Sequence, residues 1–213
     1  MDKRPIGVFD SGLGGLTVVK AMKKLLPNES ILYFGDTARL PYGMKSKELV
    51  IQYSNQIAKF LIKKNAKMII VACNTATAMA LEELKYDFKG TPIIGVIEPG
   101  SIQASLDSLN KKIGVIGTVA TIKSEAYKYA LKSIDNNINV ESFSSFNLEY
   151  DSEIAQVSLA SLEKEISKID LSNVDGLFVS CTALKIADVL DRVDDFLELG
   201  FDEEDWRYYF CIV

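Results

Sequence analysis

The chain has 213 residues, of which 48% are hydrophobic and 25% charged, and its formal net charge is −5. This composition is typical of a globular protein and excludes collagen-like, low-complexity and wholly disordered classes. The acidic balance gives no general electrostatic reason to bind nucleic acid or an anionic membrane.

Short apolar runs alternate along the chain with longer segments of helical periodicity. Strands are predicted at residues 5–9, 31–34, 67–72, 92–97, 113–117, 138–143 and 176–179. Helices are predicted at residues 16–26, across 45–65, and after Cys73-Asn-Thr-Ala-Thr77 to about residue 86. We expect Glu98-Pro-Gly100 to end the fourth strand.

This alternation predicts an α/β fold with mainly parallel sheets that are covered by helices on both faces. Such sheets bind ligands at the carboxyl ends of their strands. Polar clusters follow the predicted strands after Phe9, Phe34, Ala72, Gly117 and Ser180. We therefore expect the functional residues among these clusters.

The chain also contains an internal repeat. Ile6-Gly-Val-Phe9 recurs as Ile113-Gly-Val-Ile116, 107 residues later (113 − 6), and the strand before Cys73 recurs before Cys181, 108 residues later (181 − 73). Chance similarity between short apolar runs is the alternative. The repeat predicts two pseudosymmetric domains, residues 1–98 and 99–190, with the site in the cleft between them. A tail at residues 191–213 is expected to pack back on the first domain.

The absence of histidine restricts the chemistry that the chain can perform. It excludes a Ser-His-Asp triad, a Cys-His pair and a histidine-ligated metal. The cysteines lack a C-x-x-C spacing and a disulfide framework, so we expect no metal site and a reducing cytoplasm. The opening residues lack the pattern of a signal peptide, and no stretch approaches a membrane span of ~20 residues.

Two of the three cysteines occupy equivalent places in the repeat. Cys73 and Cys181 each lie between the end of a strand and the start of a helix, where the helix dipole is expected to ease ionisation of the thiol. Two thiols on opposite sides of a cleft would suit removal of a proton from one face of a carbon and its return to the other. The alternative is that each is an inert core residue, as we expect for Cys211.

The glycine-rich turn after the first strand does not have a nucleotide-binding pattern. Residues 12–17 fit neither G-x-G-x-x-G nor the P-loop motif. The turn is better suited to bringing the backbone close to a small anion such as a carboxylate. Asp10 and Ser11 are either helix-capping residues or polar groups that face an ammonium group or a thiol.

Three motifs in this order resemble those of the bacterial glutamate racemases. They are Val8-Phe-Asp-Ser-Gly-Leu-Gly-Gly15, Gly35-Asp-Thr-Ala-Arg-Leu-Pro-Tyr-Gly43 and Val71-Ala-Cys-Asn-Thr-Ala76. The similarity continues through residues 94–97 and 117–127, and it covers about residues 5–130 closely. It implies a cofactor-independent, cytoplasmic isomerase with two α/β domains, expected to be a homodimer, that supplies D-glutamate for peptidoglycan.

The resemblance also implies roles for individual residues. Cys73 and Cys181 would be the two acid/base thiols, with Asp10 supporting the first of them. The residues that would bind glutamate are Asp10, Ser11, Tyr42, Gly43, Asn74, Thr75 and Thr182. Further candidates are Pro41, Thr118 and Glu149, the last as a stand-in for a paired-glutamate segment of the family.

The region around the second thiol departs from the family pattern. The family usually has a histidine after Cys-Thr, whereas this chain has Ala183 after Thr182. Ser180-Cys-Thr-Ala-Leu184 is more similar to the wider superfamily of aspartate and hydantoin racemases, maleate isomerases and arylmalonate decarboxylases. Two alternatives to glutamate racemisation follow: an enzyme that acts on a small dicarboxylate, and a protein that binds a small anion without catalysis.

Overall fold

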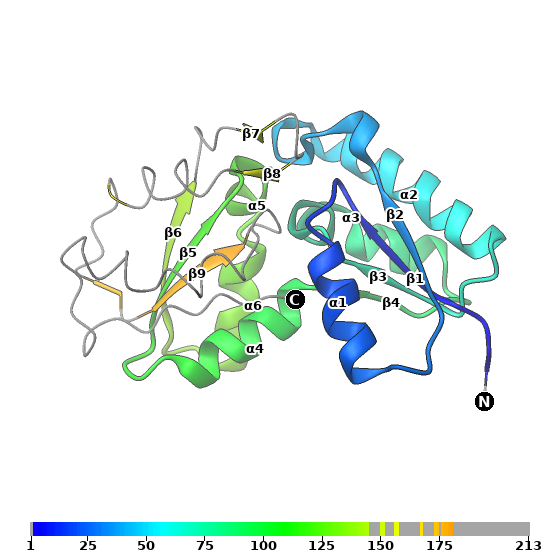
Figure 1. Ribbon diagram of the computed structural model, residues 1–213. Helices are drawn as coiled ribbons and strands as arrows, with labels where there is room; N and C mark the ends of the chain where they lie inside the picture. Colours follow the sequence, from blue (N-terminus) through cyan, green and yellow to red (C-terminus); the bar gives the residue numbers. More distant parts are fainter. Residues whose placement is uncertain are drawn as a thin grey trace.

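The structure is a computed structural model that describes residues 2–144, 150–151, 156–157, 167, 173–174 and 176–180. Within this part of the chain, strands and helices alternate, and the strands of the two larger sheets are parallel (Figure 1). The predicted α/β class with mainly parallel sheets is confirmed. No helix in the described residues is long and apolar enough to cross a membrane.

The first unit is a four-stranded sheet with strand order β2-β1-β3-β4, together with the helices that cover it. Its strands are β1 (Ile6–Asp10), β2 (Ile31–Gly35), β3 (Met68–Val71) and β4 (Ile93–Gly95). Its helices are α1 (Leu16–Leu25), α2 (Lys47–Lys63) and α3 (Asn74–Asp87), with short 3-10 turns η1 (Thr37–Arg39) and η2 (Tyr42–Met44).

Alternation of side chains along the strands produces two apolar layers in this unit. Ile6 and Val8 of β1 pack with Val18 and Met22 of α1 on one face. On the other face, Phe9 packs in a larger cluster with residues of α2 and α3. The sheet is therefore buried on both sides, which explains why its strands read as continuous apolar runs.

The second unit is a three-stranded parallel sheet with strand order β6-β5-β9, together with its helices. Its strands are β5 (Lys112–Gly117), β6 (Asn139–Ser144) and β9 (Gly176–Ser180), and its helices are α4 (Ile97–Asp107), α5 (Val119–Lys123) and α6 (Ala126–Ile134). Two short strands, β7 (Tyr150–Asp151) and β8 (Gln156–Val157), form a separate antiparallel pair.

The two parallel sheets have the same arrangement around their repeated strands. β1 lies between β2 and β3, and β5 lies between β6 and β9. The register also corresponds, because Ile6 pairs with Met68 while Ile113 pairs with Gly176. The pseudosymmetry expected from the sequence repeat is thus present in the pairing of the strands, whereas the division into residues 1–98 and 99–190 stays a prediction.

One predicted boundary is wrong. The fourth strand does not extend to Glu98-Pro-Gly100, because β4 already ends at Gly95. Glu98-Pro-Gly100 lies instead in the first turn of α4, which begins at Ile97. Proline is tolerated there because the N–H groups of a first helical turn have no partner within the helix. The predicted helix across 45–65 is shorter than expected because Ser46 caps α2, its hydroxyl accepting a hydrogen bond from the Leu49 N–H.

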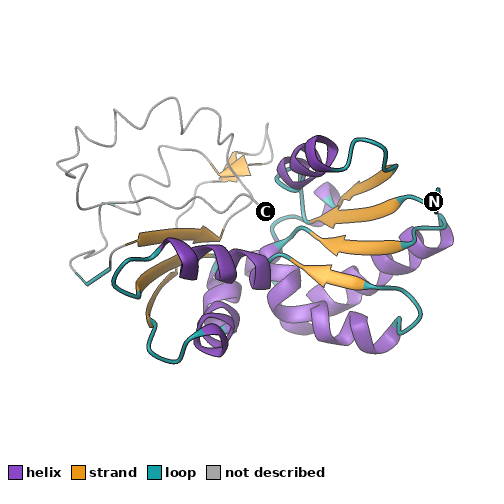
Figure 2. Ribbon diagram, turned by 90° about the horizontal axis from the view of Figure 1, so that it is seen from below, coloured by secondary structure: helices purple, strands orange, loops and turns teal. Residues whose placement is uncertain are grey.

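The carboxyl ends of the two sheets face each other (Figure 2). At their contact, Gly43 of η2 lies against Thr118 at the start of α5, so closely that a Cβ atom on Gly43 would lie 2.5 Å from the Thr118 Cβ. The hydroxyl groups of Thr75 and Thr118 are 3.0 Å apart across the same contact. The segments that follow β2, β3 and β5 therefore meet at one place.

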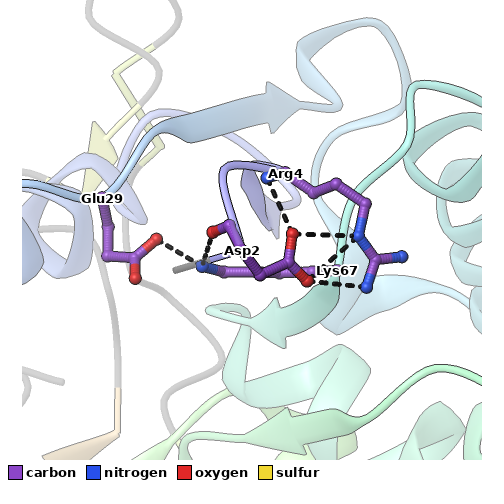
Figure 3. Close-up of polar contacts among 4 residues, drawn as sticks. All are labelled: Asp2, Arg4, Glu29 and Lys67. Carbon is purple, nitrogen blue, oxygen red and sulfur yellow. Dashed lines mark hydrogen bonds and ion pairs between the residues drawn. The ribbon is translucent and has the colours of Figure 1, made fainter.

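The amino ends of the strands in the first sheet are joined by a separate polar cluster (Figure 3). The Lys67 ammonium, just before β3, donates to the Glu29 carboxylate at 2.5 Å and to the backbone carbonyl of Asp2 at 3.0 Å. Arg4 forms an exposed ion pair with the Asp2 side chain at 2.8 Å. This cluster lies at the edge of the sheet opposite the carboxyl ends.

Candidate active site

Asp10 is the last residue of β1 and is buried, with 1% of its surface exposed. Its Oδ2 accepts hydrogen bonds from the N–H groups of Gly12 and Gly15, at 3.1 and 3.0 Å. Its Oδ1 is buried without a hydrogen-bond partner among the described residues. Burial raises the pKa of the carboxyl group, and the two backbone N–H groups oppose this rise.

The glycine-rich turn allows this burial. A Cβ atom on Gly15 would lie 2.6 Å from the Asp10 Cβ, so the chain can approach the carboxylate only because residue 15 is glycine. Tyr33 of β2 donates to the backbone carbonyl of Gly12 at 2.6 Å and fixes the turn from the other side. Asp10 thus organises the turn before α1, but the helix-capping alternative is wrong for it, because Gly15 is the N-cap residue of α1 and no side chain caps this helix. Its Oδ1 atom is left as a buried acceptor without a partner among the described residues.

Cys73 caps the amino end of α3, and its sulfur accepts a hydrogen bond from the Ala76 N–H at 3.4 Å. Burial raises the pKa of the thiol to about 12, with a further rise from the negative charge of Asp10, while the Ala76 N–H and Ser11 lower it. The predicted position at a strand–helix junction is correct. The expected easier ionisation is wrong, because desolvation and the Asp10 charge outweigh the favourable helix end.

Asn74 and Thr75 are the first two residues of α3, directly after Cys73. The Asn74 side-chain oxygen accepts a hydrogen bond from the Tyr127 hydroxyl of α6 at 2.5 Å. The Thr75 hydroxyl lies 3.0 Å from that of Thr118 and 3.2 Å from that of Thr121. Both residues of the first unit are therefore held by hydroxyl groups of the second unit.

Tyr42 has its hydroxyl group engaged within the first unit. It is buried and donates to the Asp36 carboxylate at 2.5 Å, and Arg39 also donates to Asp36 at 2.9 Å. Burial and the Asp36 charge raise the pKa of Tyr42, which keeps the hydroxyl protonated. Of its neighbours, Pro41 is exposed, whereas Gly43 is buried against Thr118.

The structure therefore brings together most of the candidates from the first half of the chain. Asp10, Ser11, Cys73 and Asn74 lie at the carboxyl edge of the first sheet, and Gly43, Thr75 and Thr118 lie where the two units meet. Cys181, Thr182 and Glu149 lie outside the described residues, as do Ala183, Cys211 and the predicted tail. Strand β9 ends at Ser180, which pairs with Gly117 just before Thr118.

Sequence reasoning gave no role to three polar residues of this region: Asp36, Thr121 and Tyr127. Asp36 follows β2 and lies inside the second motif, so its position at a strand end was an available signal. Thr121 and Tyr127 lie inside the similar segment 117–127, but their contacts with α3 join residues more than forty positions apart. Local pattern does not reveal such pairs.

Comparison with known proteins places this arrangement in a family. Residues 6–194 match the Asp/Glu/Hydantoin racemase family. The chain belongs to that family. It is 43% identical over 186 residues to the glutamate racemase of Pediococcus pentosaceus, an alignment that covers 85% of this chain and 70% of the relative.

Solved structures of glutamate racemases share the fold. The enzyme isoform RacE1 from Bacillus anthracis has a TM-score of 0.81 and 33% identity, covering 99% of this chain and 78% of that one. The Francisella tularensis enzyme, solved in complex with D-glutamate, has a TM-score of 0.77 and 35% identity, covering 99% and 88%. A likeness to the maleate isomerase Iso from Pseudomonas putida, at 16% identity and a TM-score of 0.55, shows the fold alone.

Proposed function

We propose that this chain interconverts L- and D-glutamate by transfer of the Cα proton between two thiols, without a cofactor. The observation that carries the proposal is the buried Cys73 thiol beside the buried Asp10 carboxyl group, at the edge of the sheet where an α/β fold binds ligands. The similarity to glutamate racemases over more than two thirds of their length supports glutamate as the substrate.

The site provides groups of suitable charge for the two ends of an α-amino acid. The Asp10 carboxylate is an acceptor for the ammonium group. The amino end of α3, with the side chains of Asn74 and Thr75, offers N–H and O–H donors to a carboxylate. Donors directed at the carboxylate would also stabilise the negative charge that develops on it as the Cα proton leaves.

The raised pKa of Cys73 makes thiolate formation depend on the substrate. The charge of Asp10 is one cause of the raised pKa, so an ammonium group that neutralises this charge would lower it. The thiolate then takes the Cα proton and becomes a thiol, while the Cys181 thiol donates its proton to the opposite face and becomes a thiolate. The opposite enantiomer uses the reverse steps, so protons and charge balance over each conversion.

The test is proton exchange at Cα. Purified protein is incubated in D₂O with L-glutamate and, separately, with D-glutamate, while NMR follows the Cα signal and polarimetry follows inversion. We expect exchange with inversion in the wild type and its loss in Cys73→Ala and in Cys181→Ala. Cys211→Ala is the matched thiol control and should retain activity.

The same assay separates the two alternatives. A folded protein that converts maleate but not glutamate would support an enzyme of small dicarboxylates. Stabilisation by glutamate without proton exchange would support a small-anion-binding protein. Either result would contradict the proposed racemase.

The setting of the enzyme is part of the proposal. A cytoplasmic homodimer that supplies D-glutamate for peptidoglycan is what the similarity to glutamate racemases suggests. Light scattering of the purified protein tests the dimer, because a mass of one chain at micromolar concentration would contradict it. Depletion in a bacterium tests the role, since added D-glutamate should then restore growth.

A further inference from the structure

Asn74 and Tyr127 form a hydrogen bond that joins the two units next to Cys73. The Tyr127 hydroxyl of α6 donates to the Oδ1 atom of Asn74 at 2.5 Å, between residues 53 positions apart in the sequence. Tyr127 is almost fully buried, with 3% of its surface exposed, and its ring packs with Ile97, Leu131 and other residues of the second core. Packing therefore fixes the point from which the hydroxyl reaches Asn74.

In this contact the Asn74 amide presents its oxygen to the Tyr127 hydroxyl. A side-chain amide has an acceptor oxygen on one side and two N–H donors on the other, and rotation by about 180° exchanges them. Because Tyr127 donates to the oxygen, the NH₂ group is turned away from Tyr127. A carboxylate accepts hydrogen bonds only, so Asn74 can hold one only when its NH₂ group faces the ligand.

We propose that Tyr127 is a positioning residue, which sets the amide orientation of Asn74 so that its NH₂ group is presented to the substrate carboxylate. This inference rests on the proposed function, because it takes Asn74 as a ligand of glutamate. A residue of the second unit then positions a substrate-binding residue of the first unit. In this role Tyr127 acts on the substrate through Asn74.

The neighbouring residue shows the same construction. Thr75, next to Asn74 on α3, has its hydroxyl placed by Thr118 and Thr121 of the second unit. Two consecutive polar side chains at the amino end of α3 are thus held from across the contact between units. An amide left without its partner would divide its time between two orientations, and only one of them binds a carboxylate.

The first test is the kinetic effect of Tyr127→Phe, which removes the hydroxyl and keeps the ring. We expect KM for glutamate to rise at least about twofold, the factor for an amide that spends half of its time in the wrong orientation, while kcat changes less because bound substrate selects the competent orientation. In an Asn74→Ala background the same substitution should raise KM no further, because Tyr127 acts through Asn74. Tyr129→Phe is the matched control, since Tyr129 lies on the same helix, is 64% exposed and donates to the Glu125 carboxylate at 3.3 Å.

A KM unchanged by Tyr127→Phe in an active enzyme would overturn the inference. So would an equal rise in KM with and without Asn74, because a merely structural role of the tyrosine would weaken both proteins alike. Thermal unfolding of each variant identifies any loss of stability. Partial unfolding is not expected to raise KM while leaving kcat nearly unchanged.

The second test does not depend on activity. NMR of protein labelled with ¹⁵N-asparagine reports the side-chain amide of Asn74, assigned by its loss in Asn74→Ala. We expect Tyr127→Phe to shift this signal and Tyr129→Phe to leave it in place. If the wild type fails to exchange the Cα proton while the signal still shifts, the proposed function is wrong and the orientation of Asn74 stands. An unshifted signal overturns the orienting contact itself.

Discussion

The Asp10 carboxyl group raises the pKa of the Cys73 thiol, although both lie at the carboxyl ends of adjacent strands where a proton-transfer site is proposed. Both groups are buried, and burial also raises the pKa of Asp10 itself. Without a positive charge nearby, the Asp10 charge opposes ionisation of the thiol, whereas the protonated thiol, as a hydrogen-bond donor, lowers the pKa of Asp10. Burial of the Asp10 charge therefore costs stability in the free protein, and a cationic group bound beside it would offset this cost.

Asp10→Asn should make the protein more stable and less active. The pKa of Asp10 is above its value in the unfolded chain, so its contribution to stability is present at low pH and is lost as pH rises through the folded pKa. Asparagine retains an acceptor for the Gly12 and Gly15 N–H groups but has no charge. We expect a gain on the order of 1 kcal/mol at pH 7 in chemical denaturation, with loss of most racemase activity.

Asp10→Ala is the control for the hydrogen bonds, because it leaves both backbone N–H groups without their acceptor and should destabilise the protein. An asparagine variant that unfolds more easily than the wild type at pH 7 would show that the buried charge is not the dominant cost.

The Cys73 thiol should make stability fall at alkaline pH. Its pKa is about 12 in the folded protein against an ordinary value of 9.0, so the folded state retains a proton that the unfolded state releases. The free energy of unfolding should therefore decrease between about pH 9 and 12, by at most ~1.4 kcal/mol per pH unit for one proton. Denaturation at several pH values should give a steeper fall for the wild type than for Cys73→Ala. Parallel curves would mean that the thiol ionises as easily in the folded protein as in the unfolded chain.

Gly43 should tolerate no larger side chain. A Cβ atom there would lie 2.5 Å from the Thr118 Cβ and 2.9 Å from its hydroxyl oxygen, so Gly43→Ala must push the two units apart. We expect a loss of roughly 1–3 kcal/mol in stability and of at least about tenfold in kcat/KM, because displacement of the contact misplaces groups of the site. Gly90→Ala is the matched control, since apart from its chain neighbours no atom of the described residues lies within 4 Å of its added Cβ. Similar effects of both substitutions would show that the contact at Thr118 does not matter.

Much of this organisation could be predicted from the sequence because it depends on local pattern. The apolar runs of the first unit are buried on both faces and so stand out, and the repeat around Ile6 and Ile113 reappears in the strand register. Parallel pairing brings the ends of β1 and β3 to one edge of the first sheet, and β5 ends at the corresponding edge of the second sheet. Position at a strand end is therefore enough to mark Asp10, Cys73 and Thr118 as candidates.

The remaining features depend on distances in space and on the balance of opposing effects. The raised pKa of Cys73 was missed because sequence shows the helix end that favours a thiolate but not the depth of burial that opposes it. The contacts from Thr121 and Tyr127 to α3 were missed because they join separate units. Pro99 predicts a break because a proline after a strand has the same local pattern whether it ends one element or lies in the first turn of the next.

The ion pair of Lys67 and Glu29 should stabilise the fold without affecting the reaction. Its side chains are only 15% and 24% exposed, so the pair is less screened by water than a surface ion pair. We expect Lys67→Met and Glu29→Gln each to reduce the free energy of unfolding by about 1 kcal/mol, with kcat/KM unchanged because the cluster lies at the opposite edge of the sheet. Lys85→Met removes the more exposed pair with Glu82 and should have almost no effect. A double-mutant cycle with no coupling between Lys67 and Glu29 would contradict this account.

The alanine that follows Cys181-Thr182 should make the two thiols unequal. Racemases of this type usually have a histidine at the position of Ala183, and that residue would lie next to only one of the two thiols. Because enantiomers have equal free energies, their equilibrium constant is one and kcat/KM must be the same in both directions. The difference between the thiols is therefore expected in kcat and in the uptake of deuterium at Cα without inversion. NMR in D₂O should show faster uptake from one enantiomer than from the other, and Ala183→His should reduce the difference. Equal uptake from both enantiomers, each dependent on its own cysteine, would show that the histidine is dispensable here.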